Sequence, residues 1–116
     1  MLFLGVLYHM QHPLLALERV ASVTAGQLIL ETGTDMTWFR KALLAYYPRD
    51  EAAGDETNWC GPNPAAVIAM LRTVGFPEVR VHYRLAPVRA FARSARETLA
   101  RRRLFLISRY GFHAWK

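Results

Sequence analysis

The order of apolar and polar residues along the first third of the chain predicts a strand, a helix and a second strand. Apolar runs at 2–7 and 27–32 are typical of strands that are buried on both faces of a parallel sheet. Between them, Pro13 suits the first turn of a helix that continues to about residue 24. The apolar residues of this helix fall on one stripe: Leu14, Leu17, Val20 and Ala21. This order with short connections indicates a βαβ unit with a right-handed crossover.

The middle of the chain predicts a long loop followed by a second helix. Residues 33–62 show little periodicity but many aromatic and turn-forming residues, so we expect a binding loop with a short helix around 37–45. Asn63 is a good N-cap in front of Pro64, and Gly75 is a suitable end for the helix that follows.

The last third predicts a strand, a helix and a strand. Residues 78–85 alternate between apolar and polar positions, which indicates a half-exposed strand near a sheet edge. A helix is expected over 88–103, with its arginines outward, and a buried strand over 104–110. The fold class is therefore α/β.

The length and composition of the chain indicate a single domain whose basic residues are concentrated in its last third. With 116 residues, of which 53% are hydrophobic and 21% charged, the chain suits a single domain over 1–116, short for a doubly wound sheet. Residues 72–116 hold eleven basic and two acidic side chains, whereas 1–71 hold four and seven. An arginine-rich tail fits a polyanionic partner such as RNA, and equally a solvated surface.

Cysteine usage and the apolar start suggest a compartment. Cys60 is the single cysteine, so no internal disulfide forms and no zinc-type spacing appears, and we expect a cytoplasmic protein without a metal site. The run at 2–7 lacks a basic flank and is too short to span a bilayer, so no membrane partner is expected.

Three segments resemble a known family. They are Leu4-Gly5-Val6-Leu7-Tyr8-His9, His12-Pro13-Leu14 and Leu28-Ile29-Leu30-Glu31-Thr32. They resemble the fourth strand, the following helix and the fifth strand of class I S-adenosylmethionine-dependent methyltransferases. More narrowly, they are similar to the group that contains the tRNA wobble-uridine carboxymethyltransferase, also called tRNA 5-methoxyuridine methyltransferase. The insertion before the next helix in that group resembles Tyr46-Tyr47-Pro48 and the segment from Thr57 to Asn63.

The resemblance implies the C-terminal half of a Rossmann-like sheet. Strands four to seven would then cover 2–7, 27–32, 77–85 and 104–110, with the last strand antiparallel and inserted beside the fifth. The glycine-rich turn and the acidic residue that hold the cofactor in this fold are missing from the sequence. We therefore expect a partial, truncated methyltransferase domain that binds S-adenosylmethionine weakly or not at all by itself.

The resemblance also implies site residues. Ligands of open α/β sheets bind beyond the C-terminal ends of the strands, so Tyr8 and His9 are the catalytic candidates. In the carboxymethyltransferase, the residues that match Tyr8 and Arg103 contact the carboxylate of a carboxylated cofactor, and Leu4 stands at a cofactor position. The alternatives are an aromatic residue at the core edge for Tyr8 and an ordinary loop histidine for His9.

Three further residues are candidates for substrate binding. Glu31 ends a buried strand, where an acid needs a partner, so it is either a network residue or a substrate contact. Asn58 lies in the segment that resembles the insertion. Trp59 either stacks on the substrate or packs its own loop.

The leading hypothesis is methyl or carboxymethyl transfer from S-adenosylmethionine, or its carboxylated form, to a tRNA wobble uridine or a small-molecule acceptor. The first alternative is a catalytically silent fragment. The second is a basic module that binds RNA or protein through the arginine-rich helix at 88–103. Because an apolar first strand without an upstream neighbour exposes a sheet edge, self-association through 2–7 is expected.

Overall fold

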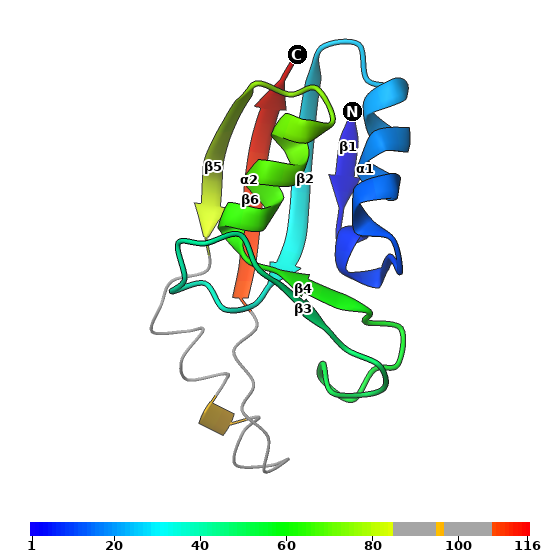
Figure 1. Cartoon of the computed structure of the whole chain (residues 1–116), viewed down its shortest axis with the longest axis vertical. Helices are drawn as coiled ribbons and strands as arrows, with labels where there is room; N and C mark the ends of the chain where they lie inside the picture. The colour runs from blue at the N-terminus through cyan, green and yellow to red at the C-terminus, as the bar shows by residue number, and fades with distance from the viewer. Residues whose placement is uncertain (85–94, 97–107) are drawn as a thin grey trace.

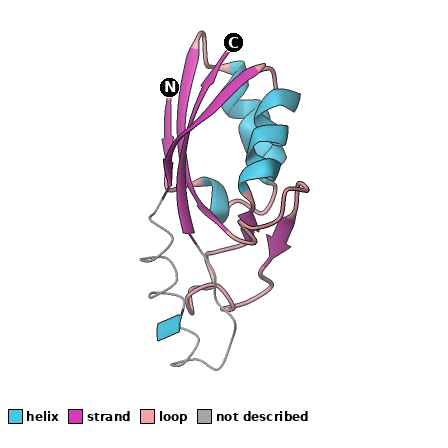
Figure 2. Cartoon of the chain, turned by 90° about the vertical axis from the view of Figure 1, so that its left-hand side faces the viewer, coloured by secondary structure: helices cyan, strands magenta, loops and turns pink. Residues whose placement is uncertain are grey.

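The structure, a computed structural model, describes residues 1–84, 95–96 and 108–116. These residues form two layers, a four-stranded sheet and a pair of helices that cover one face of it (Figures 1 and 2). The opposite face of the sheet carries no helix in the described part of the chain (Figure 2). None of the described helices has the length and apolar character needed to cross a membrane.

The sheet has the strand order β1-β2-β6-β5. The first strand, β1 (Leu2–Leu4), pairs in parallel with β2 (Gln27–Thr34). The last strand, β6 (Ser108–Trp115), lies antiparallel between β2 and β5 (Glu78–Arg84). The expected antiparallel insertion of the last strand beside the strand that begins at residue 27 is therefore confirmed.

Both helices begin at the predicted prolines. Helix α1 (Pro13–Ser22) connects β1 to β2, and α2 (Pro64–Thr73) precedes β5. The Asn63 side chain caps α2 by accepting a hydrogen bond from the amide of Ala66 at 2.8 Å. After α2, Gly75 adopts a φ of +103°, which permits the sharp turn towards β5.

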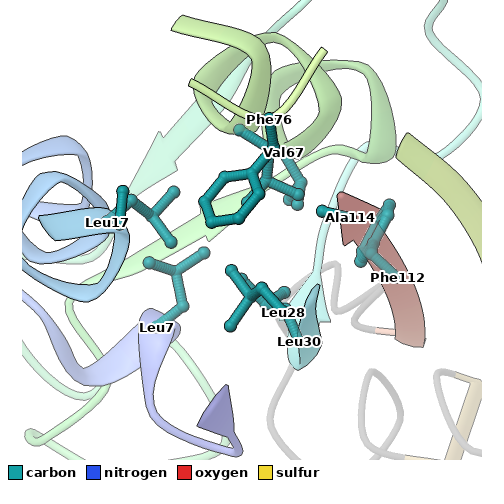
Figure 3. Close-up of a cluster of buried hydrophobic side chains, with 10 residues drawn as sticks. Leu7, Leu17, Leu28, Leu30, Val67, Phe76, Phe112 and Ala114 are labelled. Atoms are coloured by element: carbon teal, nitrogen blue, oxygen red, sulfur yellow. The ribbon is translucent and has the colours of Figure 1, made fainter. Parts of the chain in front are cut away.

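The core lies between the sheet and these helices (Figure 3). Alternate residues of β2 and β6 point into it and are fully buried: Leu28, Leu30, Phe112 and Ala114. They meet fully buried residues from the helical layer: Leu7, Leu17, Val67, Leu71 and Phe76. Each large side chain of this kind contributes about 1.5–3 kcal/mol by leaving water, so this layer carries the stability of the fold.

The prediction of a strand over 2–7 buried on both faces is wrong. Strand β1 has three residues, and Leu2 and Leu4 are 65% and 50% exposed. Gly5, with a φ of +70°, ends the strand and leads into a 3-10 turn, η1 (Leu7–His9). The exposure follows from the position of β1 at the edge of the sheet, on which the described helices cover only one face (Figure 2).

The predicted short helix at 37–45 is also wrong. Residues in this region form β3 (Leu44–Tyr46), which pairs antiparallel with β4 (Cys60–Pro62). This small sheet lies at the C-terminal ends of β1 and β2 (Figure 1).

The side chain of Asn63 explains why no helix forms there. Its Nδ2 donates to the carbonyl oxygens of Phe39 at 3.2 Å and Lys41 at 2.7 Å. Its Oδ1 accepts from the amide of Leu43 at 3.1 Å. This buried amide binds three backbone groups of the segment and holds it against the start of α2, so tertiary contact overrides local propensity.

The C-terminal predictions are tested only in part. The helix expected over 88–103 lies outside the described residues, apart from 95–96, and so does 104–107. The final strand continues to Trp115, five residues beyond the predicted end at Tyr110. Within this strand, Gly111 lies opposite Tyr83 of β5. A Cβ added at Gly111 would lie only 3.2 Å from the Cβ of Tyr83, which explains why a glycine suits this position.

Candidate functional site at the C-terminal ends of β1 and β2

The first part of the site is a trio of polar side chains, Tyr8, Glu31 and Arg109, called here the Tyr8 cluster. Nη1 of Arg109 lies 2.7 Å from Oε1 of Glu31, and Nη2 donates to the hydroxyl of Tyr8 at 3.0 Å. The hydrogen bond to Glu31, together with the charges of Glu31 and Tyr8, raises the pKa of Arg109 despite its partial burial. The guanidinium thus stays charged at any working pH.

Strand geometry places this cluster. Glu31 is in register with Leu4 of β1, and Arg109 is in register with Gly33 of β2. Because side chains alternate along strands, Glu31 and Arg109 project from the sheet face opposite α1 and α2, which carries no helix among the described residues and is called here the helix-free face. Tyr8 reaches them from η1, directly after β1.

Gly5 lies next to the cluster. A Cβ at Gly5 would stand 3.8 Å from Oε2 of Glu31 and 3.9 Å from the hydroxyl of Tyr8. The cluster is accessible, since the side chains of Arg109 and Glu31 are 46% and 24% exposed.

The chemistry of the cluster suits a ligand with opposite charges. The Tyr8 oxygen accepts a hydrogen bond from Arg109, so its own proton is available for a ligand oxygen. Arg109 has five N–H donors in a fixed fork, and Glu31 accepts hydrogen bonds only. Together these groups can hold a carboxylate next to an ammonium group.

The second part of the site surrounds His9. Its Nδ1 lies 2.9 Å from the carbonyl oxygen and 3.2 Å from Oγ1 of Thr57. Thr57 in turn donates from its hydroxyl to Oδ1 of Asp55 at 2.7 Å. The hydrogen bonds that Asp55 accepts from the hydroxyl and from the amide of Thr57 lower the pKa of Asp55, and the nearby His9 lowers it further. The imidazole ring packs 4.2 Å from the ring of Tyr8, centroid to centroid.

Next to His9 there is an open hollow of about 490 Å³. Its lining comes from η1, the residues that connect η1 to α1, helix α1 itself and the loop before β4: His9, Met10, Gln11, His12, Leu15, Ala16, Arg19 and Trp59. The amide of Trp59 donates to the carbonyl oxygen of Tyr8 at 2.9 Å, which fixes this wall of the hollow. The ring of Trp59 also packs on Tyr46, at 6.3 Å between centroids.

A buried layer supports the site from below. The hydroxyl of Tyr47 donates to Oδ2 of Asp35 at 2.6 Å, and burial together with Asp35 raises the pKa of Tyr47. Cys60 is buried, with Sγ 3.7 Å and 3.6 Å from the carbonyl oxygens of Leu7 and Met10. Burial raises its pKa to about 11, so the thiol is held protonated and is a poor nucleophile.

The predicted site residues separate into groups. Tyr8 and Glu31 come together in the Tyr8 cluster, and His9 and Trp59 both line the hollow. Leu4, on β1, is exposed and lies next to Glu31 of β2. Arg103 lies outside the described residues.

Asn58 is buried within its own loop. Its Nδ2 donates to the carbonyl oxygen of Ala52 at 3.0 Å. Within the described residues its Oδ1 is buried without a hydrogen-bond partner. The predicted substrate role of Asn58 stays a prediction.

Sequence reasoning missed Arg109. The signal that pointed to it was indirect, because an acid at the position of Glu31 requires a partner. The partner is 78 residues away in the sequence. Among the described residues, no three His, Cys, Asp or Glu side chains gather into a group that could hold a metal ion.

Comparison with known proteins supports the fold. No family model and no curated protein matches the chain. Among solved structures, the chain is similar to the N-terminal domain of EvdMO1, both with SAH bound and in the presence of SAH and D-fucose. In each case the TM-score is 0.59, the identity is 17% and the match covers 98% of this chain.

The likeness at this identity concerns the fold. The chain shares the mixed α/β fold of a domain that was solved with SAH, as the resemblance to methyltransferases implies. The match covers 45% and 44% of the two EvdMO1 chains, so this chain spans less than half of their length.

Proposed function

We propose that the chain serves S-adenosylmethionine-dependent methyl transfer and that the Tyr8 cluster contacts the amino-acid end of the cofactor. The observation that carries the proposal is the position of Tyr8, Glu31 and Arg109 beside the C-terminal end of β1 and along the C-terminal half of β2, its parallel partner. This is the edge at which open α/β sheets bind ligands. Support also comes from the shared fold of a domain solved with SAH, the product that S-adenosylmethionine leaves after methyl transfer.

The residues of the cluster fit the cofactor chemically. The amino-acid end of S-adenosylmethionine carries a carboxylate, which Arg109 and Tyr8 can bind, and an ammonium group, which Glu31 can bind. When bound, the cofactor supplies an electrophilic methyl group on a sulfonium. The role of the chain is then to orient the donor and acceptor and to exclude water. The expectation that the isolated chain binds the cofactor weakly stays a prediction.

Carboxymethyl transfer is an alternative form of the proposal, in which the resemblance assigns Tyr8 and Arg103 to the carboxylate of the transferred group. Because Arg109 donates to Tyr8, it would then bind this carboxylate instead of the one at the amino-acid end.

For the acceptor we favour a small molecule that bears a hydroxyl group. The hollow beside His9, about 490 Å³, is in the usual range for small-molecule sites. A solved structure of similar fold was obtained in the presence of D-fucose, a hydroxyl-rich sugar. The tRNA wobble uridine and the basic interaction module stay predictions, since the arginine-rich segment at 88–103 lies almost wholly outside the described residues.

Saturation-transfer NMR with S-adenosylmethionine tests the proposal, because the method detects weak binding. We expect Arg109→Met and Tyr8→Phe to lower the affinity, Arg109→Met by about tenfold or more, since a charge-assisted hydrogen bond is worth about 1.5–3 kcal/mol. Arg80→Met is the matched control, because Arg80 lies towards the opposite end of the same sheet face. Equal affinity for the wild type and Arg109→Met, with both folded, would contradict the proposal.

A further inference from the structure

The hydrogen bond between His9 and Thr57 determines where the imidazole proton lies. The partner of Nδ1 at 2.9 Å is a carbonyl oxygen, which can only accept. Nδ1 must therefore carry the proton, and in the neutral ring Nε2 carries the free lone pair. Oγ1 of Thr57, at 3.2 Å from Nδ1, agrees with this assignment because its own proton goes to Asp55.

The turn at 55–57 holds this arrangement in place. Oδ1 of Asp55 accepts from both the amide and the hydroxyl of Thr57, at 2.9 Å and 2.7 Å. The negative charge of Asp55 thus lies behind Thr57 on the Nδ1 side of the ring. The turn therefore keeps the carbonyl and hydroxyl oxygens of Thr57 next to Nδ1.

His9 also lines the hollow. Its Nδ1 is bound by Thr57 of the loop, and Trp59 and Arg19 are among the other lining residues. An indole face next to polar groups is a surface on which the ring of a polar ligand can pack.

We infer that His9 is the general base for a hydroxyl-bearing ring, such as a sugar, that binds in this hollow. The inference rests on the proposed function and deepens it. The proton of the acceptor hydroxyl moves to Nε2, the freed oxygen pair forms the bond to the methyl carbon, and the electrons of the broken carbon–sulfur bond remain on sulfur. Thr57 and Asp55 act as positioning residues, because they work through His9.

The proposal implies that methyl transfer falls as the pH is lowered, because protonated Nε2 has no lone pair to accept the acceptor proton. Among the described residues, the charged and titratable groups near His9 are Asp55 from the loop and Tyr8 from η1, and His12 and Arg19 also line the hollow.

The tautomer can be measured without cofactor or substrate. In nitrogen-15 NMR spectra of the whole chain, the His9 signals are those that disappear in His9→Asn. Asparagine is chosen because its amide can still donate to Thr57. His82→Asn, the same substitution on the helix-free sheet face, is the matched control. We expect neutral His9 to carry its proton on Nδ1. A proton on Nε2 would overturn the inference.

A titration with D-fucose in the same samples tests the acceptor. We expect the Nε2 signal of His9 to shift while that of His82 stays in place, and Trp59→Ala to weaken the binding about fivefold by removing the packing surface. No shift at His9, or equal shifts at both histidines, would contradict the assignment of the hollow. Because no cofactor is present, these results are independent of whether the chain binds S-adenosylmethionine.

Discussion

The two faces of the main sheet differ although the same strands build both. On the face covered by α1 and α2, Leu30 and Phe112 are fully buried. On the other face, the same strands present Glu31, Arg109 and Trp115 to the surface. Alternation along a strand therefore assigns stability to one face and ligand chemistry to the other. Substitutions on the two faces should have separable effects.

The helix-free face is itself divided along its length. Towards the N-terminal end of β2, Arg80 lies 5.5 Å from the ring of Trp115, and His82 stacks on His113 at 4.4 Å. At the C-terminal end lies the Tyr8 cluster, next to the hollow beside His9. Only the second end combines charged groups with the strand ends that bind ligands in open α/β sheets.

The largest expected effect is on the covered face. Phe112→Ala should lower the free energy of unfolding by about 3–5 kcal/mol, because it removes a buried ring and leaves a cavity. Trp115→Ala, three residues further along the same strand and on the other face, should cost much less. Urea unfolding of both variants checks this. Similar losses would mean that the two faces do not differ as described.

A smaller but sizeable effect is expected in the layer below the site. Gly61→Ala places a Cβ against the hydroxyl of Tyr47 and 2.9 Å from the Cβ of Asp35. We expect a loss of about 1–3 kcal/mol, because both neighbours are held by their mutual hydrogen bond. Gly26→Ala is the control, since nothing lies within 4 Å of its added Cβ. Thermal unfolding that ranks Gly26→Ala as the worse variant would refute the packing.

Alkaline pH should weaken the same layer through Cys60. Burial raises the pKa of this thiol from 9.0 to about 11, so the folded state favours the protonated form. The buried thiol therefore contributes its full share of stability below pH 9. Between pH 9 and about 11 the thiol ionises in the unfolded state but not in the folded state, so this contribution is lost as the pH rises through the window. Denaturant titrations across this window should show a steeper fall for the wild type than for Cys60→Ala. Parallel curves would indicate an accessible thiol.

The smallest effect on stability, and a distinct effect on association, is expected at β1. Its Leu2 and Leu4 are exposed, and within the described residues it pairs with β2 alone. We expect self-association through this strand and the face beside it. Leu2→Lys should shift the mass measured by light scattering towards the monomer while leaving the unfolding temperature nearly unchanged. A wild-type chain that stays monomeric at high concentration would contradict this expectation.

The sequence predicted the helices and strands that local residue patterns determine. Helices α1 and α2 follow from Pro13 and from the Asn63-Pro64 pair, and β2 follows from its apolar run. The antiparallel position of the last strand came from the resemblance, because pairing between distant strands is not encoded in local periodicity.

The missed features depend on contacts between distant residues. Strands β3 and β4 form where Asn63 binds the backbone of 39–43, which outweighs local preference. The Arg109–Glu31 pair joins residues that only the folded sheet brings together. Tyr8, His9, Glu31 and Trp59 were thus predicted as site residues from the sequence, and Arg109 was not.

The most direct test of the account is to map where SAH binds on the folded chain. Protein-observed NMR during a titration with SAH can compare two arginines of the same face, Arg109 at the C-terminal strand ends and Arg80 towards the other end. We expect the Arg109 side-chain signal and the amides of Gly5 and Tyr8 to shift in proportion to bound SAH, while Arg80 does not move. Shifts at Arg80 without shifts at Arg109, or no shifts up to the solubility limit of SAH, would contradict the assignment of the Tyr8 cluster.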